Sequence, residues 1–470
     1  MTQVSHLGYT TLNEEITVDR LPVEGTIPVW LEGSLLHNGP AKFEVGPDTF
    51  RHWFDGFAML HRFTFQNGNV SYANKFLQSD AYQSAMKEGR ITFSQFATDP
   101  CKALFKGAMT SVVNANVSIN KVAGEFVAMT EAPLPVAFDP HTLDTLGVVR
   151  FDDDITGQYG SAHPHYDFVQ RMSVSYLTEF NRQSLFKVYA VKDGEQQRRL
   201  IGSYPVLEPS YIHSFGLTEN YVVIAEFPYR VNPLNLLTSG KPFIENYEWH
   251  PQEGTKFIVM SKQDGSVVGR YESEAFFSFH HINAFERNGE ILVDISAYPD
   301  ASVVSDLYLE KLKGNAGDNS TISRNETRRY SLPLNGSSVR YERLSEYGIE
   351  LPTINYRRYN THDYGVAYGV CSDKRHPEDF TNLLIRIDVG ERAAKVWSEA
   401  YCYPGELVFA EAPNARGEDD GVVLSVVLNA KKGNSFLLVL DAHSFEEIGR
   451  AEVPHHIPFG FHGQFFPGVA

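Results

Sequence analysis

Short runs of apolar residues, separated by polar turns, recur along almost the whole chain. The runs are four to seven residues long, and β-branched and aromatic side chains fill them, as strands favour. The clearest examples are residues 126–130, 221–227, 257–260, 291–296, 383–389, 422–428 and 436–441. This pattern predicts an all-β protein built from many strands.

Dipeptides that suit tight turns lie beside many of these runs. They are Asn67-Gly68, Asp193-Gly194, Asp264-Gly265, Asn288-Gly289 and Asp420-Gly421. Because Asn-Gly and Asp-Gly readily adopt the positive φ angles of a two-residue hairpin, each pair predicts an antiparallel hairpin. A chain of hairpins over this length favours a β-propeller, although no repeat motif is visible.

Helical signal is sparse. Residues 304–312 predict one short helix. Residues 228–250 are rich in proline and apolar side chains and lack alternation, which indicates an insertion over one face of the scaffold. Since no linker divides the chain, we expect a single domain over residues 1–470, with this insertion among its loops.

Composition narrows the classes of function. The chain has 470 residues, 42% of them hydrophobic and 13% aromatic, which is enough for a large core. Its formal charge of −17 disfavours a nucleic-acid partner.

Three cysteines, Cys101, Cys371 and Cys402, form no CxxC pair, so reduced thiols in a cytoplasmic protein are expected. No apolar leader is evident and no run reaches the roughly 18–20 apolar residues that span a bilayer, so membrane contact is expected to be peripheral.

Four segments dense with glycine, proline and aromatic residues contain six of the 17 histidines. The segments are SAHPHYD (161–167), YIHSFGLT (211–218), FSFHHINAFE (277–286) and PFGFHGQF (458–465). A propeller can bring single residues from several blades together at its axis. Widely spaced single histidines are what such a metal site would require, and neutral imidazoles suit iron(II), nickel or zinc.

These four segments resemble the signature segments of the carotenoid cleavage oxygenase family. Further matches are WLEGSLLHNGPAKFEVG (30–46), FDGFAMLHRF (54–63), TDPCK (98–102) and ELPTINYRRY (350–359). The likeness covers almost the entire chain in the right order, and it is greatest to the animal-type branch. The resemblance implies a seven-bladed β-propeller whose metal face is covered by a dome of loops and helices.

The resemblance also implies the metal site. One Fe²⁺ per chain would be held by His163, His213, His280 and His462. It further identifies Glu131, Glu350 and Glu406 as carboxylates that accept the other ring N–H of a ligand, as metal-bound histidines usually require. The fourth ligand has no such partner in the family. His165, His281, His52, His61, His455 and His456 are read as structural.

The family cleaves a conjugated carbon–carbon double bond of a carotenoid or apocarotenoid with molecular oxygen, giving two carbonyl products. A stilbenoid-cleaving branch has a Lys and a Tyr where this chain has Thr130 and Phe96, and neither residue here can take over their role. Phe96 and Thr130 are therefore expected to contact an apolar polyene. Phe279, which lies beside a ligand, is expected to contact the substrate or to pack against the ligand ring.

Several alternatives stay open. They are stilbenoid cleavage, an isomerohydrolase on the same iron site and a propeller that binds without catalysis. A calcium-dependent hydrolase is disfavoured because calcium prefers oxygen ligands. Because carotenoids reside in bilayers, we expect peripheral membrane contact through the apolar segments 101–112 and 232–243.

Overall fold

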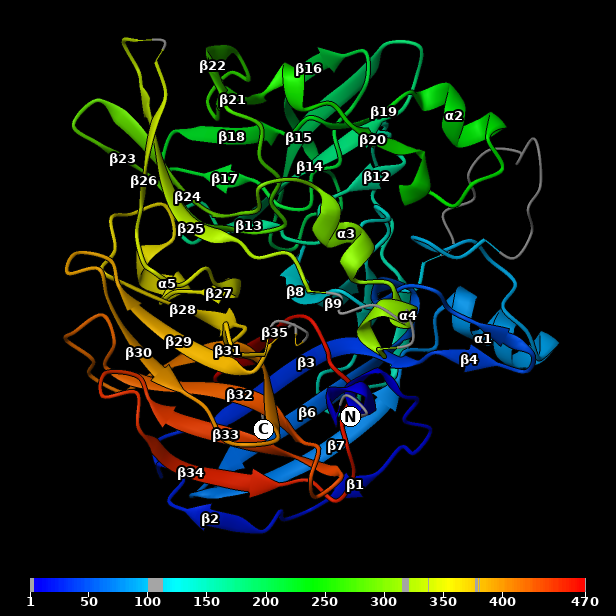
Figure 1. The fold of residues 1–470 in the computed structure, drawn as a ribbon, viewed down its shortest axis with the longest axis vertical. Coiled ribbons are helices and arrows are strands. Elements are labelled where there is room, and N and C mark those ends of the chain that lie inside the picture. The colour runs from blue at the N-terminus through cyan, green and yellow to red at the C-terminus, as the bar shows by residue number, and fades with distance from the viewer. Residues whose placement is uncertain are drawn as a thin grey trace.

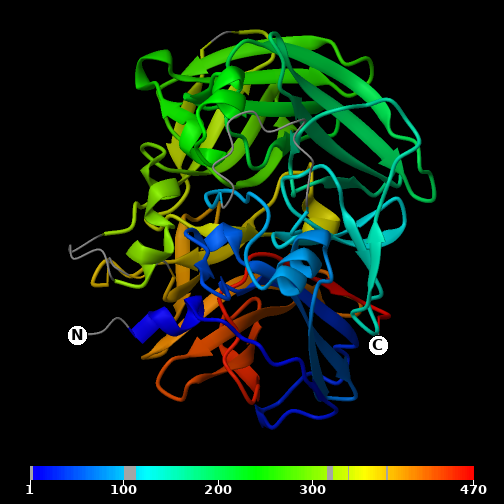
Figure 2. The same ribbon diagram turned by 90° about the vertical axis from the view of Figure 1, so that its right-hand side faces the viewer.

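The computed structural model describes residues 4–99, 113–314, 321–336, 338–376, 379 and 381–469. In this part of the chain, seven antiparallel sheets of four or five strands are arranged around one axis (Figures 1 and 2). The expectation of an all-β, seven-bladed β-propeller is confirmed.

Each sheet is one blade, and the blades are numbered here along the chain. Blade 1 contains β1 (Thr17–Val18), β3 (Gly33–Lys42), β6 (Phe57–Gln66), β7 (Asn69–Phe76) and β35 (Gly463–Phe466). Blade 2 contains β8 (Ser118–Val122), β9 (Glu125–Met129), β10 (Val136–Phe138) and β11 (Thr145–Val148). Blade 3 contains β12 (Tyr159–Gly160), β13 (His165–Asp167), β14 (Met172–Glu179), β15 (Ser184–Lys192) and β16 (Arg199–Val206). Blade 4 contains β17 (Gly216–Leu217), β18 (Tyr221–Glu226), β21 (Thr255–Ser261) and β22 (Val267–Ser273).

The last three blades follow the same plan. Blade 5 contains β23 (His281–Arg287), β24 (Glu290–Ala297), β25 (Glu326–Pro333) and β26 (Arg340–Arg343). Blade 6 contains β27 (Glu350–Thr353), β28 (Val366–Cys371), β29 (Leu383–Asp388) and β30 (Ala393–Trp397). Blade 7 contains β31 (Cys402–Glu411), β32 (Gly421–Asn429), β33 (Asn434–Asp441), β34 (Glu447–Glu452) and β2 (Val23–Gly25).

Neighbouring blades bury each other's faces, which explains the continuous apolar runs in the sequence. In β33, Leu437 belongs to a core cluster with Leu35 of blade 1, whereas Leu438 belongs to a cluster with Tyr368 of blade 6. Successive side chains of a strand point to opposite faces, so a strand between two blades must be apolar at nearly every position.

The two ends of the chain close the ring. The C-terminal strand β35 pairs with β3, with His37 opposite Gly463 and Ser34 opposite Phe466. Near the other end, β2 pairs with β34 of blade 7. Blades 1 and 7 are therefore each completed by a strand from the far end of the sequence.

A dome of short elements covers one side of the ring, and Figure 1 shows α1 and α2 projecting at its right-hand edge. The helices of the dome are α1 (Asp80–Glu88), α2 (Pro233–Thr238), α3 (Ser302–Asp306) and α4 (Leu309–Leu312), whereas α5 (Tyr356–Tyr359) lies toward the left-hand side of Figure 1. The 3-10 turns are η1 (Val4–Tyr9), η2 (Trp53–Asp55), η3 (Ile244–Asn246) and η4 (Pro251–Glu253). Two small hairpins, β4 (Glu44–Val45) with β5 (Asp48–Thr49) and β19 (Tyr229–Val231) with β20 (Tyr247–Trp249), complete the list.

The predicted antiparallel hairpins are confirmed, because all five dipeptides lie at connections between strands that pair antiparallel. Asn67-Gly68 joins β6 to β7 and Asn288-Gly289 joins β23 to β24 as two-residue turns, with positive φ at all four residues. The expected two-residue turn is wrong for the three Asp-Gly pairs, because the Asp does not adopt positive φ in any of them and the connections are longer. In one of these loops the Asp264 carboxylate accepts a hydrogen bond from the Ser266 backbone N–H.

The single helix predicted over residues 304–312 is divided. It becomes α3 and α4, separated by Leu307 and Tyr308. At the break the backbone pairs with another segment, since the Leu309 N–H donates to the Arg51 carbonyl and the Leu307 carbonyl accepts from the Trp53 N–H. These long-range bonds replace the local bonds that a continuous helix would make.

A buried ion pair within blade 5 also accepts a hydrogen bond from the segment that leads into β28 of blade 6. Asp294 in β24 accepts two hydrogen bonds from Arg329 in β25, at 2.8 and 2.7 Å, and one from the Tyr364 hydroxyl at 2.5 Å. The Asp294 and Arg329 side chains are 0% and 6% exposed. Removing one partner of such a pair leaves an uncompensated buried charge.

Replacing Asp294 by Ala is expected to lower the free energy of unfolding by about 3–5 kcal/mol, the usual result of breaking a buried pair. Urea denaturation followed by circular dichroism measures the change. Arg340→Ala, which breaks an exposed pair with Glu290 in the same blade, should cost less than about 1 kcal/mol. Equal losses in the two variants would contradict a special role for the buried pair.

Candidate metal centre

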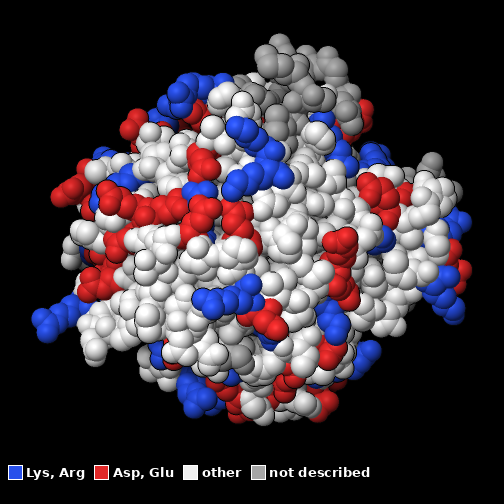
Figure 3. Space-filling view, turned by 90° about the horizontal axis from the view of Figure 1, so that it is seen from below, with Lys and Arg blue, Asp and Glu red and all other residues white. Residues whose placement is uncertain are grey.

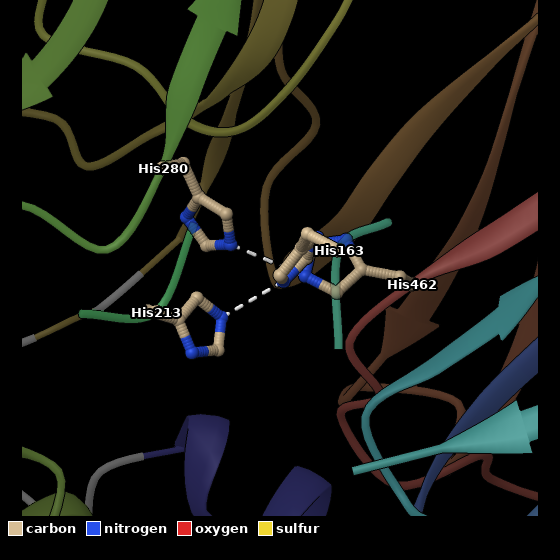
Figure 4. A group of neighbouring side chains, drawn as sticks. All are labelled: His163, His213, His280 and His462. Carbon is tan, nitrogen blue, oxygen red and sulfur yellow. Dashed lines mark hydrogen bonds between the residues drawn. The ribbon is translucent and has the colours of Figure 1, made fainter. Parts of the chain in front are cut away.

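Four histidines from four blades meet near the propeller axis, at the starts of the inner strands. His163 lies between β12 and β13, while His213, His280 and His462 lie shortly before β17, β23 and β35. One ring nitrogen of each lies within 4.8 Å of those of the other three. Figure 4 shows the four rings gathered around one point. The His163 and His213 Nε2 atoms are 2.9 Å apart, and those of His280 and His462 are 3.2 Å apart. The structure thus brings together all four histidines that the sequence singled out.

Three buried carboxylates stand behind three of these rings. The Nδ1 atom of His213 is 2.7 Å from Glu131, that of His280 is 2.5 Å from Glu350, and that of His462 is 2.7 Å from Glu406. An Nδ1–H that donates to a carboxylate leaves its Nε2 unprotonated, with a lone pair directed at the centre. These are the three glutamates predicted from the sequence. Among the described residues, His163 makes no such bond.

This arrangement fits a cation. With both Nδ1 atoms donating, His280 and His462 direct two Nε2 lone pairs at each other across 3.2 Å, which is repulsive without a positive charge between them. Nitrogen ligands about 2.1 Å from one ion in an octahedral arrangement lie about 3.0 Å apart along an edge. The two short Nε2 separations match that edge.

Burial keeps the site in the protonation state that a metal needs. It lowers the pKa of His163 and of His280 well below the ordinary value, and the neighbouring histidines lower both further. Burial also raises the pKa of Glu350 to about 8. A divalent cation at the Nε2 atoms would oppose that rise, because a nearby positive charge favours the ionised carboxylate.

The carboxylates have further donors that hold them in place. Glu131 accepts a hydrogen bond from the Tyr211 hydroxyl at 2.8 Å. Glu350 accepts one from the backbone N–H of Leu351 at 3.2 Å, and Glu406 accepts one from the backbone N–H of Gly463 at 2.7 Å. Tyr211 was not predicted from the sequence. The only feature of the sequence that marks Tyr211 is its position two residues before His213.

The neighbouring histidines point elsewhere. His165 contacts the Tyr356 hydroxyl at 3.0 Å and the Phe215 carbonyl at 2.8 Å, and His281 contacts the Ser214 hydroxyl at 2.9 Å. The histidines outside the four segments are likewise engaged, His52 with the Val304 carbonyl, His61 with the Tyr72 hydroxyl and His455 with the His456 carbonyl. Their placement agrees with the structural role expected for them.

A narrow apolar cavity opens on the centre. Phe96, Thr130 and Phe279, the three substrate-contact candidates, all line it. Residues that sequence reasoning did not assign to it are Trp53, Phe54, Val117, Leu307, Leu351 and Phe461. Phe54 and Phe461 lie within family-like segments, which could have marked them. Val117 and Leu307 carry no comparable signal.

Comparison with known proteins shows which family this chain belongs to. The family model described as retinal pigment epithelial membrane protein matches residues 9–467. The chain is 36% identical to the mitochondrial carotenoid-cleaving dioxygenase of Mustela putorius furo, over 97% of this chain and 95% of the relative. It is 32% identical to the β,β-carotene 15,15'-dioxygenase of Gallus gallus, over 95% of each. The chain belongs to the carotenoid oxygenase family.

Solved structures share the fold of this chain. An apocarotenoid oxygenase of Synechocystis superposes with a TM-score of 0.88 at 24% identity, over 99% of both chains. The cobalt-substituted form of that enzyme superposes with a TM-score of 0.85 at 25% identity, over 99% of this chain and 98% of the other. The family and enzyme class expected from the sequence are therefore confirmed.

The described residues contain no helix long and apolar enough to cross a membrane. Two cysteines, Cys371 and Cys402, are free thiols, and Cys101 lies outside the described residues.

Replacing His280 by Ala should remove one ligand and its carboxylate contact, so that metal content falls strongly while the fold persists. Metal analysis of purified protein, with circular dichroism to check the fold, measures this. His281→Ala is the matched control, because that ring faces Ser214 rather than the centre. Full metal occupancy in the His280 variant would remove it from the ligand set.

Proposed function

We propose that this carotenoid oxygenase is a non-haem iron(II) dioxygenase that cleaves a conjugated double bond of a carotenoid or apocarotenoid and releases two carbonyl products. The observation that carries the proposal is the four-imidazole centre at the end of an aromatic cavity. His163, His213, His280 and His462 would hold one Fe²⁺, whose chemistry when bound is the activation of molecular oxygen.

The protein's own residues would supply position and environment. Four ligands on an octahedral ion leave two positions open, which suits a metal that must also bind a reactant. Glu131, Glu350 and Glu406 would fix the tautomers of three imidazoles and increase their basicity. The neutral ligand set leaves the positive charge of the ion to be balanced by these carboxylates.

The cavity walls favour a polyene. Trp53, Phe54, Phe96, Phe279 and Phe461 present flat apolar surfaces, and Thr130 lies beside Glu131. The described lining contains no Lys, Arg or Tyr, so a phenolic hydroxyl would find no cationic or phenolic partner there. This is why an apolar polyene is preferred over a stilbenoid.

Isomerisation on the same centre is the second candidate. The relative from Galleria mellonella, 35% identical over 97% of this chain and 95% of its own, is called a carotenoid isomerooxygenase. A ligand set alone does not distinguish cleavage from isomerisation, because both would use the same imidazoles.

Iron-loaded protein incubated with carotenoids, apocarotenoids and hydroxystilbenes under labelled oxygen is expected to give cleaved apocarotenoid carbonyls that carry the label. Mass spectrometry identifies the products and measures how much label they carry. Turnover of the stilbenes alone would show that Thr130 and Phe96 do not exclude phenols. Isomerised product formed without oxygen would favour the second candidate.

Peripheral membrane contact belongs to the same proposal, since the substrate resides in bilayers. In α2, Leu234 and Leu237 are 61% and 46% exposed, whereas Leu236 packs against the core. Figure 3 shows the molecule from below, the side away from α2, where acidic and basic side chains are interspersed. The net charge of the whole chain is −17. Apolar insertion therefore suits this protein better than electrostatic docking. The other candidate segment, residues 101–112, lies outside the described residues.

Replacing both Leu234 and Leu237 by Ser should reduce co-sedimentation with phosphatidylcholine liposomes, because it removes the exposed apolar side chains of α2 without touching the core. Val169→Ser is the control, since this 93% exposed residue lies beyond the end of β13 that points away from the metal centre. Unchanged binding in the double variant would count against α2 as the contact.

A further inference from the structure

A buried tyrosine shares one carboxylate oxygen with a metal-site histidine. The Tyr211 hydroxyl donates to Oε1 of Glu131 at 2.8 Å, and Nδ1 of His213 lies 2.7 Å from the same oxygen. Tyr211 is 0% exposed and Glu131 is 9% exposed. The hydroxyl, the carboxylate and the imidazole form a continuous chain that ends at the four-histidine centre.

The carboxylate depends on such donors. A buried carboxylate is costly unless hydrogen bonds compensate its charge, and hydrogen bonds to charged groups are the strong ones. Loss of the Tyr211 hydroxyl would leave Glu131 with one donor fewer and free to rotate, and its hold on His213 would weaken.

The ring of Tyr211 is fixed by its neighbours. Its centroid lies 6.1 Å from that of Phe277 in a stacked arrangement, and 5.8 Å from that of Phe96 and 5.9 Å from that of Tyr247 in edge contacts. Its backbone N–H donates to the Tyr229 carbonyl at 2.9 Å. The hydroxyl is therefore held at the carboxylate by both the ring and the backbone.

We infer that Tyr211 is a positioning residue of the metal centre, acting through Glu131 to orient His213 and keep its Nε2 directed at the metal. The inference rests on the proposed function only in requiring that the site binds a divalent metal ion. Tyr211 also packs against Phe96, a wall of the cavity, so it links the metal centre to the substrate side.

Tyr247 provides a matched control in the same aromatic cluster. It is 6% exposed, and its buried hydroxyl has no hydrogen-bond partner among the described residues. Tyr→Phe at either position removes one oxygen and keeps the ring. The two variants differ in whether that oxygen bonds to the carboxylate.

The test measures Co²⁺ binding by metal-free protein in competition with a chelator, together with the ligand-field absorption of the cobalt form. Tyr211→Phe should bind Co²⁺ about tenfold more weakly than the wild type, the lower end of the range for outer partners of metal ligands, with displaced absorption bands. Tyr247→Phe should match the wild type in both. Thermal unfolding of the metal-free variants separates a loss of fold stability from a loss of affinity.

A double-mutant cycle with Glu131→Gln tests the route. If Tyr211 acts through Glu131, Tyr211→Phe should weaken Co²⁺ binding little further in the Glu131→Gln background. Additive effects, or wild-type affinity and spectrum in Tyr211→Phe, would overturn the inference. Wild-type protein that binds Co²⁺ but, when loaded with iron, cleaves no polyene would refute the proposed reaction and leave this comparison valid. Wild-type protein that binds no Co²⁺ would overturn the inference itself.

Discussion

Directing several nitrogen lone pairs at one point is unfavourable until a cation occupies that point, and the centre of this protein is built around that constraint. Each of three imidazoles is turned inward by a carboxylate at its Nδ1, and each carboxylate is held by a further donor from the protein. The repulsion is thus maintained by buried hydrogen bonds, which cannot rearrange without leaving charges uncompensated. A site held in this way is pre-organised for a divalent ion.

The propeller makes that arrangement possible because each ligand comes from a different blade. The four histidines lie near the starts of inner strands, so a rigid sheet anchors every imidazole. The carboxylates come from other places: Glu350 opens β27, Glu406 lies in an irregular part of β31, and Glu131 follows β9. No local segment could supply this set, which explains spacings of 50 residues or more between the ligands. Trp53, Phe54 and Leu307 add apolar walls to the cavity beside this centre.

Much of this organisation could be predicted from the sequence, and the exceptions share a cause. Strand periodicity and the unusual surroundings of the four histidines are local properties, so the sequence alone predicts the strands and the candidate ligands. The Asp-Gly pairs lie in hairpins whose connections are longer than two residues, and Asp264 illustrates this by bonding to a residue outside its pair. The segment 304–312 forms two helices because its backbone pairs with residues 51–53. Val117, Leu307 and Tyr211 reach the centre through long-range packing, which a single sequence does not display. The sequence therefore predicts that the cavity is apolar, but it identifies only some of the residues that line it.

The closing strand has a consequence for the order of assembly. His462 lies directly before β35, which completes blade 1 only by pairing with β3, a strand formed more than four hundred residues earlier. During synthesis the other three imidazoles leave the ribosome first, and the fourth follows only with β35. A metal ion captured by the full set would link the first blade to the segment that closes it, so retention of the metal and closure of the ring become one cooperative event. A nascent chain without β35 would have only three of the four imidazoles, and the reactive centre would exist only in a protein already protected by its own fold.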